Sequence, residues 1–157
     1  MKNRFMLTLL CFSVLSFAQG QAPQYGEPIS LENAKKVLSA AEAFALGKQW
    51  TVVIAIVDTG GNLVLLEKLD NTQYGSIDVA IGKAKTANNF KRSTKVFEDA
   101  IAGGGVGLRV LSLPGAVPIE GGELILSNGK IIGAIGVSGM QAPQDAEVAK
   151  AGLAVIK

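Results

Sequence analysis

Histidine is absent from this chain of 157 residues, and cysteine occurs once, as Cys11. Ser-His-Asp and Cys-His catalysis both need a histidine, and common zinc sites are built from histidine and cysteine side chains. Hydrolases with such sites and zinc centres of this kind are therefore excluded. The segment Gly136-Val137-Ser138-Gly139 matches part of a nucleophile elbow, but without a histidine we interpret it as a strand end that turns into a loop.

The chain has little net charge, since it has 15 basic and 13 acidic residues. Lys2 and Arg4 precede an uncharged, mainly apolar run over residues 5–18, which ends in small residues. This is the pattern of a secretory signal peptide, and the run is shorter than the roughly 20 residues that span a membrane. We predict a signal peptide over residues 1–18; the alternative is a buried N-terminal helix.

Cleavage is expected after Ala18, with Gly20 or Ala22 as the alternatives. It would remove Cys11 and two of the 15 basic residues, which leaves 13 residues of each sign. The remaining domain then has no thiol, no disulfide and no net charge. Nucleic acids and anionic membranes attract basic surfaces, so neither is an expected partner. The expected location is the periplasm or the cell exterior.

The rest of the chain reads as one domain over residues 30–157, preceded by a leader over 19–29. The leader holds prolines and glutamines and is predicted to be extended and mobile. We predict helices over residues 30–46, 76–90, 93–102 and 143–157, with Ser30 and Ser76 as N-caps of the first two. Strands are predicted over 51–57 and 63–69, with shorter strand-like pieces at 108–113 and 116–119.

A hairpin over residues 120–140 completes the pattern. Its two apolar runs are joined by Asn128-Gly129, the dipeptide most typical of a type I′ turn. Gly133 and Gly136 interrupt the second run. Glycine weakens a strand, so these two positions predict close approach of a helix, a backbone or a ligand.

The resulting order is α-β-β-α-α-β-β-β-α. Strands linked as hairpins, with helices between the blocks, indicate an α+β domain on a central antiparallel sheet. The strand over residues 51–57 is apolar on both faces, so both faces are expected to be covered. A partner subunit is one way to cover them.

Polar residues outside the strands provide the candidate site. Asp58 is interpreted as a turn residue, whereas Asp70 has no evident structural role. Lys83, Thr86 and Phe90 lie along one side of the second helix and could edge a pocket. Glu120 precedes Gly121-Gly122, whose backbone N–H groups could face an anion, although a tight turn explains them as well.

The glycine run over residues 103–107 lacks the lysine and the helix start of a P-loop. It is interpreted as a flexible loop, or as a lid over the site.

Several motifs together resemble the GlcG/HbpS family of haem-binding and haem-degrading domains, which also form the C-terminal domain of PduO-type proteins. They are VDTGGNLVLLEKLD at 57–70, SIDVAIGKAKTANNFKRSTKVFE at 76–98, GG at 121–122, GKIIGAIGVSG at 129–139 and QDAEVAKAG at 144–152. The resemblance covers nearly the whole domain. It implies a profilin-like α+β fold, homo-oligomers and, for some members, haem binding outside the cell or in the periplasm.

Haem binding would depart from the usual chemistry here, because no histidine can ligate the iron. Tyr25, Tyr74, Met140, Thr86 or a lysine could serve as the axial ligand. The expected pocket lies between the Lys83–Phe90 helix and the loops at Asp70 and at 120–122.

Two other functions stay open. One is an enzyme that acts on a small organic acid, with Asp70 and Lys83 as acid and base. The other is a structural oligomer without a ligand. No catalytic residue and no protein-bound metal ion is assigned.

Overall fold

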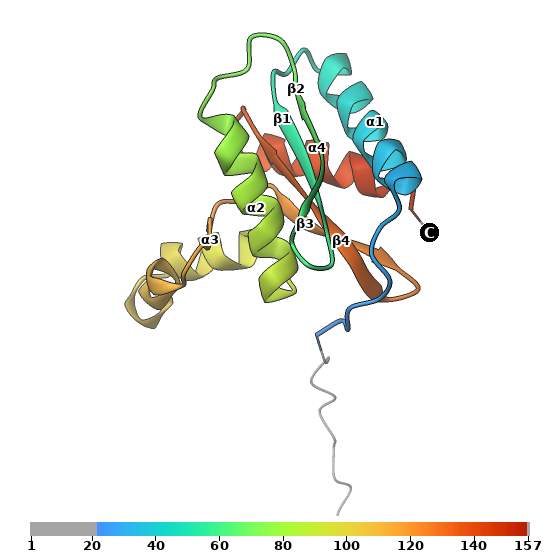
Figure 1. The fold of residues 1–157 in the computed structure, drawn as a ribbon. Coiled ribbons are helices and arrows are strands. Elements are labelled where there is room, and N and C mark those ends of the chain that lie inside the picture. The colour runs from blue at the N-terminus through green and yellow to red at the C-terminus, as the bar shows by residue number, and fades with distance from the viewer. Residues whose placement is uncertain (1–21, 157) are drawn as a thin grey trace, which may run out of the picture.

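The computed structural model describes residues 22–156, so the predicted signal peptide and its cleavage site lie outside the described residues. Figure 1 shows a sheet with helices on both faces. The elements in chain order are α1 (Leu31–Gly47), β1 (Val53–Asp58), β2 (Leu63–Lys68), α2 (Ser76–Phe90), α3 (Lys95–Ala102), the 3₁₀ helix η1 (Gly105–Ser112), β3 (Gly122–Ser127), β4 (Lys130–Ser138) and α4 (Ala142–Leu153). Within residues 22–156, no helix is long and apolar enough to cross a membrane.

The sheet has four strands in the order β2-β1-β4-β3, and each neighbouring pair is antiparallel. The helices α1 and α4 cover one face, and α2 covers the other (Figure 1). The predicted α+β fold on an antiparallel sheet is confirmed. The predicted order of helices and hairpin strands is also confirmed, with one local exception at η1.

Both faces of β1 are buried, as its sequence predicts. Ile54 and Ile56 join the larger core cluster with α1 and α4, whereas Val53 and Ala55 pack with Ala80 of α2. Each buried isoleucine or valine side chain contributes about 1.5–3 kcal/mol when it leaves water. The helices of the chain itself supply this cover, so the strand needs no partner subunit for it.

Gly136 is the point where α2 lies closest to the sheet. A Cβ at this position would fall 2.1 Å from the carbonyl oxygen of Ala80 and 2.5 Å from the amide nitrogen of Ala84. The prediction of close approach is confirmed here, and the approaching element is a helix.

The β3–β4 turn confirms the predicted type I′ geometry. Asn128 and Gly129 have φ values of 50° and 72°, and Ser127 pairs with Lys130 across them. Positive φ at both central residues matches the twist of the flanking strands.

The segment before β3 differs from the prediction. Residues 105–112 form η1, which replaces most of the strand-like piece predicted at 108–113 and the end of the glycine loop predicted at 103–107. Residues 116–119, the other predicted piece, join no strand. Short apolar runs do not distinguish helix from strand by pattern alone. Gly107 decides the outcome, because a Cβ there would fall 1.8 Å from the carbonyl oxygen of Ala100, so η1 packs directly on α3.

The second half of the predicted leader runs along β4. β1 ends opposite Gly133, which leaves the backbone of Ile131 and Ile132 without a strand on that side. Gly26 N donates to Ile131 O at 2.7 Å, and Ile29 N donates to Ile132 O at 2.7 Å. The composition of the leader predicts mobility. In the structure, however, this part of the leader forms hydrogen bonds with the backbone at the end of β4 that β1 does not reach.

Candidate functional site

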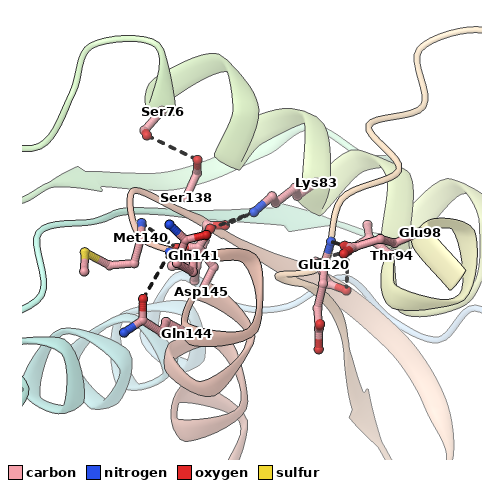
Figure 2. A network of polar contacts seen from close by, with 12 residues as sticks. Ser76, Lys83, Thr94, Glu98, Glu120, Ser138, Met140, Gln141, Gln144 and Asp145 are labelled. Carbon is pink, nitrogen blue, oxygen red and sulfur yellow. Dashed lines mark hydrogen bonds and ion pairs between the residues drawn. The ribbon is translucent and has the colours of Figure 1, made fainter. Parts of the chain in front are cut away.

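The centre of the candidate site is a buried ion pair between Lys83 of α2 and Asp145 of α4 (Figure 2). Lys83 Nζ lies 2.8 Å from Asp145 Oδ2 and also donates to the carbonyl oxygen of Val137 at 2.9 Å. The side chains are 1% and 3% exposed. Lys83 is therefore neither a solvated helix charge nor open to a ligand; it links two helices across the end of the sheet.

The second oxygen of the Asp145 carboxylate accepts a hydrogen bond from Met140 N at 3.0 Å. Burial raises the pKa of this carboxyl group, while the Lys83 ammonium and the Met140 N–H act in the opposite direction. The carboxylate thus fixes both the ammonium and the loop that leads from β4 into α4.

Gly121 and Gly122, at the start of β3, lie directly against Lys83 of this ion pair. Gly121 has φ +120°, and a Cβ there would lie 2.9 Å from Lys83 Nζ. A Cβ on Gly122 would lie 2.4 Å from the carbonyl oxygen of Lys83. Lack of a side chain at both positions allows the strand to pass directly over the lysine.

The backbone N–H groups on either side of Gly121 have hydrogen-bond acceptors within the chain. Gly122 N donates to Thr94 Oγ1 at 2.9 Å, and the amide of Glu120 donates to the carboxylate of Glu98 (Figure 2). These two N–H groups already have protein acceptors, which favours the tight-turn interpretation over anion binding.

Thr86 and Phe90 attach the following segments to α2. Thr86 Oγ1 donates to Gly82 O at 2.7 Å and accepts from Val117 N at 2.8 Å. Phe90 is half-buried and packs edge-on against Phe97 of α3, with ring centroids 5.4 Å apart. Both side chains have packing roles in this structure.

Ser76 differs from its prediction as an N-cap. Gly75 holds the cap position, and no side chain caps the helix there. The Ser76 hydroxyl instead accepts from Ser138 at 3.2 Å and from Gln73 Nε2 at 3.0 Å. Ser138, at the end of β4, is thus a buried link between strand and helix.

Asp58 is the predicted turn residue. Its Oδ1 accepts from Gly60 N at 2.8 Å and from Asn62 N at 2.9 Å. Slight burial alone would raise the pKa of this carboxyl group, but the hydrogen bonds from the turn lower it overall.

Asp70 lies elsewhere, on the wall of a cavity between the end of α1 and the edge of the sheet. We call it the α1–β2 cavity; it has a volume of about 440 Å³. The residues that line it are Glu42, Leu46, Gln49, Trp50, Thr51, Glu67, Lys68, Leu69 and Asp70. Asp70 is exposed there, whereas the Lys83 ammonium is bound to Asp145, so the structure does not bring the proposed acid and base together.

Asp145, the partner of Lys83, is not among the site residues that the sequence predicts. It is 62 positions away from Lys83, and no spacing rule connects them. The sequence does not reveal the α1–β2 cavity either, because its walls come from α1, from the residues that lead into β1 and from the end of β2. Local sequence indicates one wall of the cavity at most, because the charged residues Glu67 and Lys68 follow an apolar run in the same strand.

A second surface lies on the opposite side of β2, against α2. Leu66, Ile77 and Ile81 are half-buried there. Tyr74 is 86% exposed at the end of this surface, and Lys68 Nζ lies 5.5 Å from its ring centroid. We call these five residues the β2–α2 surface.

The donor set for a haem iron is small. Among residues 22–156, Tyr25 donates its hydroxyl to Asn88 O at 2.7 Å, and Met140 is half-buried against the core. Thr86 is buried with both functions of its hydroxyl in use, and Lys83 is held in its ion pair. Tyr74 is the more exposed of the two tyrosines, at 86% against 40% for Tyr25, and phenolate is a known axial ligand of haem. The β2–α2 surface therefore fits haem in its chemistry: an apolar side, an oxygen ligand and a cation.

The comparisons with known proteins agree with the motifs. The family model described as haem degrading protein HbpS-like matches residues 29–154. Protein GlcG of Escherichia coli strain K12 is 35% identical over 110 residues, which covers 70% of this chain and 81% of GlcG.

Two solved structures share the fold. HbpS of Streptomyces reticuli, solved as a double mutant, has a TM-score of 0.77 at 27% identity and covers 92% of this chain and 98% of its own. PduOC, solved as a haem complex, has a TM-score of 0.75 at 28% identity and covers 83% of this chain and 96% of its own. The resemblance inferred from the motifs is confirmed. This chain belongs to the HbpS-like family.

Proposed function

We propose that this protein binds haem or a related tetrapyrrole outside the cytoplasm. The observation that supports it most is the likeness to PduOC, a domain of the same fold that was solved with haem bound. Membership of the HbpS-like family points in the same direction.

The β2–α2 surface is the proposed site. Leu66 and Lys68 point to the same side of β2 because side chains alternate along a strand, and that side faces α2. Ile77 and Ile81 would contact the porphyrin, and Tyr74 would supply the oxygen that ligates iron. The Lys68 ammonium would pair with a propionate.

Bound haem would supply an iron centre whose reactivity depends on its axial ligand. The role of the chain is to hold it. Tyr74 has few neighbours that would have to move, since it is 86% exposed. Glu67 alternates with Leu66 and Lys68 along β2, and Glu42 belongs to α1, so these two carboxylates lie on the other side of β2 and would not oppose the propionates.

Titration of the purified protein with haemin tests the proposal. We expect a Soret band that is shifted from that of free haemin. The Tyr74→Phe variant should bind at least about tenfold more weakly, because removal of an iron ligand costs more than the loss of a supporting group. Tyr25→Phe is the matched control, since the Tyr25 hydroxyl already bonds to Asn88 O. Spectra that equal those of free haemin would contradict haem binding, and equal binding by both variants would contradict Tyr74 as the ligand.

The proposed location is the periplasm or the cell exterior, supported by the basic start and the apolar run over residues 5–18. N-terminal sequencing of the protein from fractionated cells tests it. We expect a mature chain that begins at Gln19 and is absent from the cytoplasmic fraction.

We also propose that copies of this chain associate through α3 and η1, which project from the body beside α2 (Figure 1). Five large apolar residues are exposed there or close by: Val96, Val106, Leu108, Leu111 and Ile119. Such a concentration is typical of an association surface. Light scattering should give a mass above that of one chain, and Leu111→Glu should lower it; a wild-type monomer would contradict the proposal.

A further inference from the structure

The α1–β2 cavity has the features of a second ligand site. It is bounded by α1, by the residues that lead into β1 and by the end of β2. Its volume of about 440 Å³ is in the range of small-molecule pockets. Leu46, Trp50 and Leu69 give it an apolar wall. Of the residues that line it, Lys68 also belongs to the β2–α2 surface.

The polar side of the cavity is negative. Glu42 comes from α1, Glu67 from β2 and Asp70 from the loop after β2. None of these carboxylates is in a salt bridge with a basic side chain in the part of the chain that the structure describes; those present are Lys36–Glu32, Lys83–Asp145 and Lys95–Asp99.

The nearby cations have other contacts. Lys68 Nζ donates to Leu69 O at 3.3 Å and lies over the ring of Tyr74. Lys48 Nζ lies 5.5 Å from the ring centroid of Phe44 and 5.8 Å from that of Trp50. Among the described residues, no salt bridge therefore compensates the carboxylates of the cavity.

Glu67 is the most informative of these groups. Its Oε1 is buried and has no hydrogen-bond partner among the described residues. A buried acceptor without a donor is rare and costs free energy. Burial, and then the charge of Glu42, raise the pKa of the Glu67 carboxyl group.

We propose that the α1–β2 cavity binds a small organic ammonium ion, whose N–H groups meet Glu42 and Glu67 and whose apolar body lies against Leu46, Trp50 and Leu69. An N–H donor would satisfy Glu67 and separate the two negative charges. The apolar wall calls for a carbon body, and no group of three or more acidic residues within 22–156 is arranged as a metal site. A ligand with carboxylates, such as haem, would be repelled here.

Trp50 provides the readout, because it is the one tryptophan of the chain and lines the cavity. The protein is titrated at neutral pH with three probes of similar size: 2-phenylethylammonium, 2-phenylethanol and 3-phenylpropionate. We expect saturable quenching or a spectral shift with the ammonium, binding at least about tenfold weaker with the alcohol, and none with the carboxylate. Equal affinity for the ammonium and the alcohol would overturn the proposal, and so would no response to the ammonium.

Variants then locate the site. Glu67→Gln and Glu42→Gln keep the size of each side chain, and each should weaken ammonium binding at least about tenfold. Glu147→Gln is the control, since Glu147 is an exposed residue of α4 outside the cavity. Unchanged affinity in both cavity variants would overturn the proposal. Should a variant fail to fold, the three probes on the wild-type protein still decide.

This inference does not rest on haem binding, and the same variants separate the two. Tyr74→Phe should bind the ammonium like the wild type, and Glu67→Gln should bind haemin like the wild type. Loss of ammonium binding in Tyr74→Phe would contradict two separate sites.

Discussion

Lys83 Nζ and Asp145 Oδ2 lie 2.8 Å apart at the end of the sheet, although the two residues are separated by 62 positions in sequence. Lys83 belongs to α2, on one face, and Asp145 belongs to α4, on the other (Figures 1 and 2). A single ion pair thus connects the two layers that enclose the sheet.

Asp145→Ala should lower the free energy of unfolding by about 3–5 kcal/mol, because it leaves a buried ammonium without its partner. Urea unfolding measures this. The double variant Lys83→Met/Asp145→Leu should recover much of the loss, since it removes both charges from the interior. A loss below about 1 kcal/mol in Asp145→Ala would mean that water solvates the ammonium, as at a surface.

Gly136→Ala should lower stability by about 1–3 kcal/mol or more, because the added methyl group collides with the backbone of α2. Gly47→Ala, at the end of α1, is the matched control. No atom lies within 4 Å of a Cβ there, so this change should be close to neutral. Thermal unfolding of both variants checks the difference; equal melting temperatures would show that α2 can move away.

Binding of an ammonium ligand in the α1–β2 cavity should weaken as the pH falls. The pKa of Glu67 is raised above its model-compound value by burial and by Glu42, so this carboxylate gains its proton at a higher pH than a free glutamate. Affinity should be full above the raised pKa and should decrease through it, while the ligand stays protonated throughout. Trp50 fluorescence titrations at several pH values measure this, and Glu67→Gln should flatten the profile.

Removal of residues 22–28 should expose the end of β4. Ile131 N donates to Gln24 O at 2.8 Å, so hydrogen exchange at the Ile131 amide should become faster in the shortened protein. Exchange at Val137, whose amide donates to Gly121 O, serves as the internal control. Unchanged protection at Ile131 would indicate that the leader is mobile, as its composition predicts.

Local sequence was sufficient for much of the fold. Ser30 accepts from Asn33 N at 3.2 Å as the predicted cap of α1, and Asn128-Gly129 forms the predicted turn. The continuous apolar run over residues 51–57 predicted that both faces of that strand are buried. Each of these features depends on residues that are close in sequence, because caps, turns and side-chain alternation are set by neighbouring backbone geometry.

The site depended on segments that are distant in sequence. The sequence around Lys83 is that of a surface lysine, and the sequence around Ser76 is that of a helix cap. Their actual roles depend on Asp145 of α4 and Ser138 of β4, which are distant in sequence. Residues 108–113 are apolar enough for a strand, but Gly107 allows residues 105–112 to pack on α3 as a 3₁₀ helix.

The sequence alone determined the family, the α+β class and the absence of histidine chemistry. The tertiary structure decided which charges are paired and which are not: Lys83 with Asp145 in the interior, and Glu67 with no partner beside a cavity. The reason is that the energy of a charge depends on its burial and on the groups within a few ångströms, and folding brings these from far along the chain.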